Sequence, residues 1–171
     1  MAQRSTFSIR EYRSQDYSAV VNLMSSLQSH FASVDSFGEM RTFSSIEEAK
    51  TYFDQGLKDV KEMNGSTFVA LADNQVVGFI QGITTTHEGE VMHVLGHKKS
   101  KEGWIGLLFV DSKYRGQGIG KKLLDEIRTD FVHKQCTTMR LLVMSDNHET
   151  VAVYKKYGFQ PKDIEMVLSL E

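Results

Sequence analysis

Hydrophobic residues recur along this chain with two spacings, one typical of helices and one typical of strands. The clearest helical pattern is Ile119, Leu123, Ile127 and Phe131, in which apolar residues return every four positions and define one face of a helix. An apolar run over 104–110 comes directly before it and is typical of a buried strand. The middle of the chain is therefore predicted to be a strand that leads through a short turn into an amphipathic helix.

The same two spacings predict the other elements. Ser45 to Glu48 has the S-x-x-E pattern of a capping box that opens a helix. Asp73-Asn74 is a turn between two β-rich segments, whereas 84–101 fits neither spacing. The predicted strands are 6–11, 67–71, 76–83, 104–110, 137–144 and 164–170, and the predicted helices cover 20–31, 45–63, 119–131 and 149–157. The order β-α-α-β-β-β-α-β-α-β predicts an α/β fold with a mixed sheet.

Composition narrows the class of protein. The chain has 171 residues, enough for a real core, and we expect 1–171 to be a single domain. A net charge of -2 offers no basic field for nucleic acid. The single Cys rules out an internal disulfide framework. No apolar run approaches the ~20 residues of a membrane span, and no signal peptide is recognisable. We expect a cytoplasmic protein that binds neither nucleic acid nor membrane.

The turn after the strand over 104–110 is rich in glycine and predicts an anion site. The segment Arg115-Gly116-Gln117-Gly118-Ile119-Gly120 stands where a helix begins. The first turn of a helix has free N–H groups and a partial positive charge, and glycine lets a ligand approach the backbone. Such a segment is suited to phosphate. A dinucleotide fingerprint would need Gly at position 121 and a Walker loop would need Ser or Thr at position 122, but both positions are Lys.

What remains is the pattern Arg115-x-x-Gly118-x-Gly120. It resembles the acetyl-coenzyme A signature of the GNAT superfamily of N-acetyltransferases. Asn147 and the run A-V-Y-K-K-Y-G-F over 152–159 resemble a second mark of that family, an Asn after the fifth strand followed by a helix that ends in a Y-x-K-x-G-F-like run. The element order also resembles the GNAT fold over nearly the whole chain. The resemblance implies a mixed, mostly antiparallel sheet flanked by helices, although Pro161 leaves little room for a separate last strand.

The resemblance also implies a function. It implies an acyltransferase that moves the acetyl group of acetyl-coenzyme A to a primary amine by direct attack, without a metal. Backbone donors where the core strand ends are expected to hold the thioester carbonyl, and the glycine turn is expected to hold the pyrophosphate. The residues expected to bind the cofactor are Phe109, Val110, Arg115, Gly116, Gln117, Gly118, Ile119, Gly120, Lys121, Asn147 and Tyr154.

Tyr154 is the candidate general acid, because it matches the family's tyrosine in the Y-x-K-x-G-F-like run. Its hydroxyl can protonate a departing thiolate of pKa ~8.5 only if its own pKa of ~10 is not raised much. The alternative role is a core aromatic packed under the helix. Tyr157 is the fallback acid.

Glu102 is the candidate base, because it comes just before the core strand, where GNAT bases are often carboxylates. The alternative is a solvated surface glutamate, and His93, His97 or a water molecule are rivals for the base. His93 and His97 also have the H-x-x-x-H spacing of a metal pair, but no third ligand accompanies them. Cys136 is expected to be a small buried residue and not a nucleophile.

The acceptor is the least determined part of the prediction. The resemblance implies that 31–43 and 84–102 line its site, where Asp35 and Glu39 suit a cationic amine with an apolar body. A small amine, an aminoglycoside-like drug, a polyamine and a peptide N-terminus all fit this description. A homodimer is one expected assembly. A non-catalytic acetyl-coenzyme A sensor or interaction module stays open as the alternative function, because a fold does not determine function.

Overall fold

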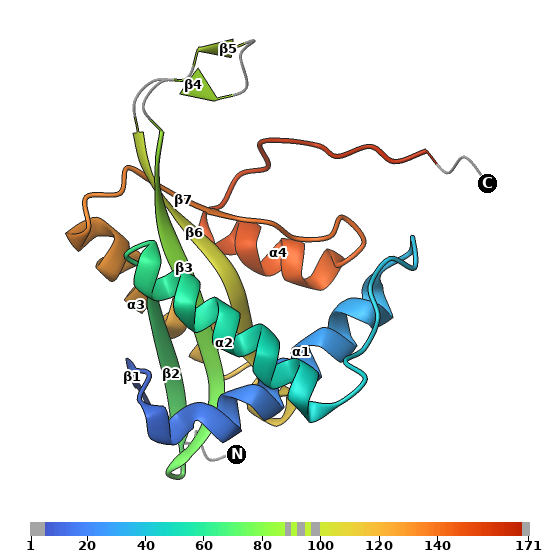
Figure 1. Ribbon diagram of the computed structural model, residues 1–171, viewed down its shortest axis with the longest axis vertical. Coiled ribbons are helices and arrows are strands. Elements are labelled where there is room, and N and C mark those ends of the chain that lie inside the picture. Colours follow the sequence, from blue (N-terminus) through green and yellow to red (C-terminus); the bar gives the residue numbers. More distant parts are fainter. Residues whose placement is uncertain (1–5, 88–89, 92–94, 97–99, 169–171) are drawn as a thin grey trace.

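A five-stranded sheet in the order β1-β2-β3-β6-β7 forms the centre of the computed structural model, which describes residues 6–87, 90–91, 95–96 and 100–168 (Figure 1). Neighbouring strands pair antiparallel, except that β6 and β7 are parallel. The strands are β1 (Phe7–Glu11), β2 (Ser66–Ala72), β3 (Gln75–His87), β6 (Ser100–Val110) and β7 (Thr138–Leu141). This mixed, mostly antiparallel sheet confirms the predicted fold class.

Two pairs of helices cover the two faces of the sheet (Figure 1). The helices α1 (Tyr17–Val34) and α2 (Ile46–Glu62) pack on one face, and α3 (Ile119–His133) and α4 (His148–Tyr157) pack on the other. Short 3₁₀ turns, η1 (Ser14–Asp16) and η2 (Ser112–Tyr114), precede α1 and α3. Within the described ranges, no helix is both long enough and apolar enough to cross a membrane.

Each face of the sheet has a hydrophobic core of its own, because successive strand residues point to opposite faces. On β2, Phe68 and Ala70 belong to the core under α3, whereas Val69 belongs to the core under α1 and α2. The largest fully buried side chains include Phe53, Phe79 and Met24 on the α1–α2 side and Ile80, Leu123 and Ile127 on the α3 side. Burial of an aliphatic or aromatic side chain contributes about 1.5–3 kcal/mol, so the sheet is held from both faces.

The strands β3 and β6 are longer than predicted and form an arm beyond the helices (Figure 1). Their ladder continues as far as His87 opposite Ser100. A separate pair of short strands, β4 (Glu90–Val91) and β5 (Leu95–Gly96), follows β3 in the chain. This is the stretch over 84–101 that hydrophobic spacing left unassigned. The β-branched run Thr84–Thr86 favours a strand, but it lacks the apolar alternation that would have identified one.

The predicted last strand is wrong over the described residues 164–168. Past α4, residues 159–168 form neither helix nor strand, and the segment runs outward from the body of the protein (Figure 1). Pro161 lacks the N–H group that a strand ladder needs, and no hairpin forms in the described part of this segment. As a result, Ile164, Met166 and Leu168 are 88%, 91% and 82% exposed.

The pairing between β6 and β7 is short, and its end shapes the site described below. The last pair is Ile105 opposite Leu141. The next residue of β6, Gly106, is a bulge, because β3 pairs with Ile105 and Leu107 and skips it. Beyond this point β7 has ended while β6 continues, so no strand of the described chain pairs with the β7 side of residues 106–110.

The close approach of α3 to the sheet requires glycine at position 103. A Cβ at Gly103 would overlap the ring of Phe131 on α3. Overpacking of this kind costs about 1–3 kcal/mol. We therefore expect Gly103→Ala to lower the free energy of unfolding by about that amount in a urea titration.

Gly106→Ala is the matched control on the same strand, because a Cβ there would meet nothing within 4 Å. Its free energy of unfolding should stay within about 0.5 kcal/mol of the parent. Phe131→Leu should recover part of the loss in the Gly103→Ala background. Equal stability of Gly103→Ala and the parent would show that α3 does not press on the sheet at this point.

Candidate active site

The unpaired edge of β6 over 106–110 is a row of backbone groups that a ligand can reach. Half of the N–H and C=O groups of a strand point to each side, and β7 has ended on this side. The side chain of Phe109 is buried against α1 and α2, and that of Val110 packs toward α3. The two side chains therefore hold this part of the strand from both faces, while its backbone stays beside the opening between β6 and β7.

The glycine turn follows the open edge and begins α3. Gly118 is the N-cap residue with φ of 89°, and Gly116 has φ of 76°. Glycine adopts this left-handed conformation without strain. The first helical hydrogen bond is donated by Lys122 N–H to the Gly118 carbonyl at 3.1 Å. The N–H groups of Ile119, Gly120 and Lys121 therefore come too early for a helical acceptor.

Space around the turn is open. A Cβ at Gly116 or Gly118 would meet nothing within 4 Å. The backbone N–H groups, the positive end of the α3 dipole and the absence of side-chain bulk at both glycines together form a cradle for an anion. The turn thus combines free backbone N–H groups with open space, and phosphate binding there stays a prediction.

Arg115 ties the turn to the end of β6. Its Nε donates to the carbonyl of Val110 at 3.0 Å, and its guanidinium carbon lies 5.4 Å from the centre of the Phe109 ring. The side chain is exposed, and with Nε committed to the strand the terminal N–H groups are available to a ligand. Arg115 therefore adds positive charge next to the open edge.

The other side chains of the turn have different surroundings. Ile119 is 1% exposed and anchors the start of α3 in the core. Lys121 points outward and pairs with Asp125 at 2.9 Å. The Oε1 atom of Gln117 is buried and has no hydrogen-bond partner among the described residues. Of the predicted cofactor residues in the turn, Ile119 and Gln117 thus offer their backbone groups more readily than their side chains.

Asn147 lies at the N-terminus of α4 and is 6% exposed. Its Oδ1 accepts the N–H of Thr150 at 3.3 Å, which caps the helix. Its Nδ2 lies 3.3 Å from Nε2 of His30, a residue of α1. Asn147 therefore joins the helix that follows β7 to a helix on the other face of the sheet.

Tyr154 projects from α4 into the core under α3 and is half-buried. Its ring packs edge-on against Phe159, with centroids 5.6 Å apart. Burial raises the pKa of Tyr154 to about 12, so the condition of a pKa near 10 does not hold. The hydroxyl is fully protonated at neutral pH, but it is a weaker acid than an exposed tyrosine. The hydroxyl of Tyr157, the fallback acid, already donates a hydrogen bond to Asp125 at 3.0 Å, so its proton is engaged within the protein.

Glu102 is 6% exposed, which excludes the alternative of a solvated surface residue. Arg140 of β7 donates from Nη2 to Glu102 Oε1 at 2.8 Å, and its guanidinium lies 5.8 Å from the centre of the Trp104 ring. By strand alternation, this cluster faces the side of the sheet that α1 and α2 cover. Arg140 Nε and Thr85 Oγ1 are buried and find no hydrogen-bond partner in the described part of the chain.

The thiol of Cys136 is poorly suited to nucleophilic attack. Burial raises the pKa of this thiol, so little thiolate exists at neutral pH. The next residue, Thr137, donates its N–H to the carbonyl of Lys101 at 2.8 Å. Cys136 therefore lies beside the start of β6, at the opposite end from the glycine turn. His93 and His97 lie outside the described residues, and among the residues that are described no cluster of three metal-binding side chains occurs.

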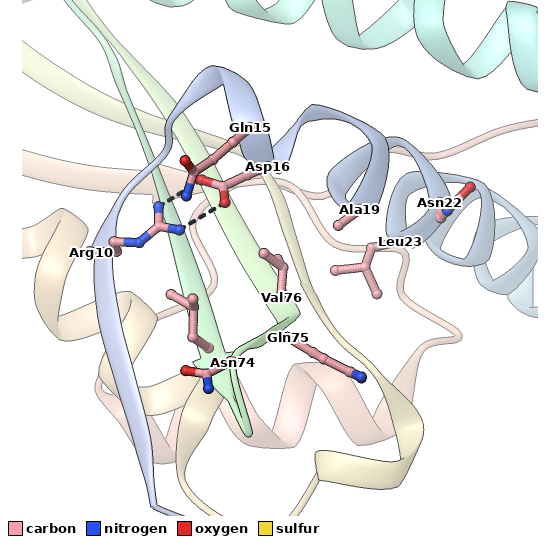
Figure 2. A pocket seen from close by; sticks show the side chains of 10 residues that line it. Arg10, Gln15, Asp16, Ala19, Asn22, Leu23, Asn74, Gln75 and Val76 are labelled. Atoms are coloured by element: carbon pink, nitrogen blue, oxygen red, sulfur yellow. Dashed lines mark hydrogen bonds and ion pairs between the residues drawn. The ribbon is translucent and has the colours of Figure 1, made fainter.

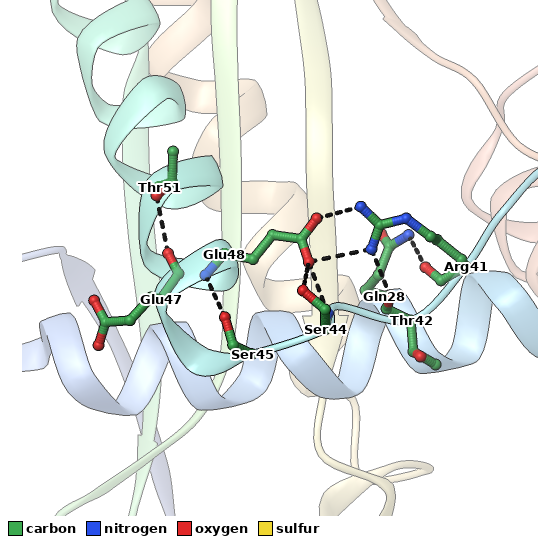
Figure 3. A network of polar contacts seen from close by, with 8 residues as sticks. All are labelled: Gln28, Arg41, Thr42, Ser44, Ser45, Glu47, Glu48 and Thr51. Atoms are coloured by element: carbon green, nitrogen blue, oxygen red, sulfur yellow. Dashed lines mark hydrogen bonds and ion pairs between the residues drawn. The ribbon is translucent and has the colours of Figure 1, made fainter.

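A polar network organises the connection between α1 and α2 (Figure 3). Glu48 pairs with Arg41 and accepts the N–H and the hydroxyl of Ser44 at 2.7 and 2.8 Å. The bonds from Arg41, and then those from Ser44, lower the pKa of Glu48 to about 2. Ser45 accepts the N–H of Glu48 at 3.2 Å, which confirms the predicted cap of α2. Gln28 of α1 donates to the carbonyl of Arg41 at 2.6 Å, so the connection is held against both helices.

Asp35 is a structural residue of the same connection. Its carboxylate accepts the N–H groups of Met40 at 2.6 Å and Phe37 at 3.0 Å. These bonds, Met40 first, lower the pKa of Asp35. Both oxygens are thus committed to the loop, and the expectation that Asp35 binds a cationic amine gains no support. Glu39 beside it is exposed.

A hollow of about 510 Å³ lies elsewhere, between β1, α1 and the turn from β2 to β3 (Figure 2). On its wall Arg10 and Asp16 satisfy each other through two hydrogen bonds of 2.6 and 2.8 Å. None of the predicted site residues lines this hollow. The candidate active site is therefore placed at the unpaired edge of β6 and the glycine turn, where most of the predicted cofactor residues lie.

A sequence profile decides the family. The profile of the acetyltransferase (GNAT) family matches residues 31–159, well over half of the chain. The chain belongs to the GNAT acetyltransferase family. The predicted family is thus confirmed, and with it the predicted enzyme class, an acyltransferase that depends on acetyl-coenzyme A.

Known proteins similar to this GNAT chain act on amines. This chain is 25% identical over 105 residues to a spermine/spermidine N(1)-acetyltransferase of Bacillus subtilis, and the match covers 56% of this chain and 69% of that protein. It is 32% identical over 62 residues to a thialysine N-epsilon-acetyltransferase of Bos taurus, covering 36% of each. The aminoglycoside N-acetyltransferase AAC(6′)-Iy, solved in complex with coenzyme A, has the same fold, with a TM-score of 0.72 at 16% identity over 99% of this chain and 97% of that one.

The GNAT motifs do not reveal three residues that the structure adds to the site. His30 precedes Asn147 by 117 residues, and no local spacing relates the two. Arg140 and Trp104 join Glu102 across the parallel pair β6 and β7. One signal was available for Arg140, which is the only charged residue of the predicted strand over 137–144.

Proposed function

We propose that this protein, as a single N-acetyltransferase domain, transfers the acetyl group of acetyl-coenzyme A to a primary amine by direct attack. Tyr154 is the proposed acid and Glu102 the proposed base. The observation that carries the proposal is the continuity of the glycine cradle with the unpaired edge of β6 over 106–110. A phosphate cradle alone would suit many ligands, whereas a cradle that leads into an open strand edge suits a long ligand with phosphates at one end and amides along its arm.

The cosubstrate fits this site by its chemistry. The N–H groups of Ile119, Gly120 and Lys121 suit the pyrophosphate, and the exposed guanidinium of Arg115 adds charge beside it. The backbone groups on the unpaired side of 106–110 suit the amides of the pantetheine arm, as an added strand would. An N–H group near Phe109 and Val110 then suits the thioester carbonyl, where a fixed donor stabilises the negative charge that develops on oxygen.

Three chemical tasks remain for the side chains. The amine, with a free pKa near ~10.4, must lose a proton before or during attack. Its nitrogen then forms a bond to the carbonyl carbon, and the bond from that carbon to sulfur breaks. The leaving sulfur takes a proton or a hydrogen bond, and Tyr154 is the proposed donor. Because burial raises the pKa of Tyr154 to about 12, we expect its contribution near the lower end of the ~10²–10⁴-fold range of general acids.

The surroundings of Glu102 support a base on the acceptor side. Its carboxylate faces the side of the sheet that α1 and α2 cover, and Arg140 of β7 donates to it at 2.8 Å, which fixes its position. A charged carboxylate can accept the proton of an ammonium substrate directly or through a water molecule. Glu102 is deeply buried, so a relay through water is the arrangement that we favour.

An amine acceptor is supported by the relatives, which are named for acetyl transfer to polyamines, thialysine and aminoglycosides. We propose that the acceptor meets the opening beside the α1–α2 connection. That connection is already ordered by Glu48 and Arg41, so little ordering entropy is lost when a substrate binds. A screen of spermidine, lysine-like amines, aminoglycosides and peptides, with free thiol as the readout, would identify the acceptor class.

Gly118→Glu tests the cradle. The new carboxylate would bring negative charge and bulk to the place proposed for the pyrophosphate, so coenzyme A affinity measured by calorimetry should fall at least ~10²-fold, or about 2.7 kcal/mol. Gly38→Glu is the matched control, because Gly38 also has a positive φ, of 73°, and open space around it. Its affinity should equal that of the parent. A folded Gly118→Glu variant with unchanged affinity would place the cofactor elsewhere.

Tyr154→Phe tests the acid. Only a hydroxyl is lost, so cofactor affinity should stay near that of the parent, while kcat should fall roughly 10²-fold. Cys136→Ala accompanies it and should leave turnover unchanged, because no acetyl-enzyme is formed. A Tyr154→Phe variant that keeps parental kcat would remove the tyrosine from the mechanism, and an inactive but folded Cys136→Ala variant would contradict direct transfer.

Glu102→Gln tests the base. A base must be unprotonated to act, so the rate of the parent should fall as pH decreases, and this acidic limb should be lost or displaced in the variant. Glu126→Gln, a change at an exposed position of α3, is the control and should keep the parental profile. An unaltered acidic limb in a folded Glu102→Gln variant would assign the base role to another group.

A further inference from the structure

We infer that His30 is a positioning residue of the active site, which holds Asn147 and thereby fixes α1 against the start of α4. The inference rests on the proposed function, because it assigns His30 a role in acetyl transfer. The observation behind it is the contact of 3.3 Å between His30 Nε2 and Asn147 Nδ2. The two residues belong to helices on opposite faces of the sheet.

The direction of this hydrogen bond follows from the cap of α4. Asn147 uses Oδ1 to accept the N–H of Thr150, so its amide cannot turn over without uncapping the helix. The end that faces His30 is therefore the NH₂ group, which only donates. His30 Nε2 must offer its lone pair, and the ring proton must be on Nδ1. The contact thus requires a neutral imidazole in one tautomer.

The contact between His30 and Asn147 lies between the two sides of the proposed site. Asn147 follows β7, on the far side of the opening from β6, and it is one of the proposed cofactor residues. His30 lies in the last turns of α1, directly before the connection that ends at Ser45 and is proposed to meet the acceptor. Among the hydrogen bonds of the described residues, this is the only one that joins α1 to the cap of α4. His30 therefore links the acceptor side of the opening to the cofactor side.

The side-chain amide of Asn147 can donate to His30 and to a ligand at the same time. The Nδ2 group of Asn147 carries two hydrogens, so one can be donated to His30 while the other stays available to a ligand in the opening. Loss of His30 leaves the Oδ1 of Asn147 able to accept the N–H of Thr150, but the amide is no longer held from α1. We therefore expect the cap to loosen while cofactor binding changes little. What is lost is the fixed distance between α1 and α4, and the acceptor should then bind and align less well.

The test compares His30→Leu with His30→Gln. Leucine has no acceptor, so we expect KM for the amine to rise about fivefold to tenfold, the range of one lost hydrogen bond. Glutamine can accept the same N–H through its amide oxygen, so His30→Gln should return KM to within about threefold of the parent. Coenzyme A affinity should be parental in both variants. His133→Leu, which removes an exposed histidine from α3, is the matched control and should behave as the parent.

A second readout does not require turnover. Hydrogen exchange at the first amides of α4 should be faster in His30→Leu than in the parent and close to parental in His30→Gln. Parental KM and exchange in His30→Leu would overturn the inference. Equal loss of kcat in both variants at parental KM would also overturn the inference, because that result would assign His30 to proton transfer instead of positioning. If the parent itself acetylates no amine, the proposed function fails, while the exchange measurement still decides whether His30 holds α4.

Discussion

The early end of the β6–β7 pairing is the constraint on which the rest of the structure depends. Two parallel strands that stayed paired to Val110 would bury every backbone group of β6 in a ladder. Because the last pair is Ile105 with Leu141, residues 106–110 keep one free edge beside the glycine turn. The bulge at Gly106 falls at this same point, so the strand changes its pairing on both sides within one residue.

Helices on both faces of the sheet hold the strand that has this unpaired edge. The core under α3 reaches Val110 and Tyr154, and the core under α1 and α2 reaches Phe109. The polar groups near the opening are mostly engaged in contacts of their own, as in the pair of Glu102 with Arg140 and the cap formed by Asn147. A site that is ordered before its ligands arrive loses less entropy when they bind.

Local features of the sequence predicted most of the fold and the glycine turn at the start of α3. The helix from Ile119 needs only its apolar face and the glycines before it, and the cap at Ser45 depends on four consecutive residues, so both were visible in the sequence. The strand over 137–144 was predicted too long, since β7 ends at Leu141 and Leu142, although apolar, is 88% exposed. Hydrophobic spacing indicates the capacity for a strand, but it does not say where the pairing with a neighbouring strand stops.

Properties that depend on distant segments could not be predicted. The raised pKa of Tyr154 comes from burial under α3, and burial is a property of the folded chain. The partner of Asn147 lies 117 residues away and that of Glu102 lies 38 residues away. In each case the resemblance indicated one residue of a pair, and only the topology identified the other.

The two separate cores have a consequence for how such an enzyme can diversify. Substitutions in contact tend to couple, whereas those in separate clusters tend to add independently. The glycine turn begins α3 and depends on the core beneath that helix, whereas the connection from α1 to α2 depends on the core of the opposite face. Mutations can therefore accumulate on the α1–α2 face without disturbing the core beneath the glycine turn, so the proposed acceptor side can change while the turn proposed for the acetyl donor keeps its support.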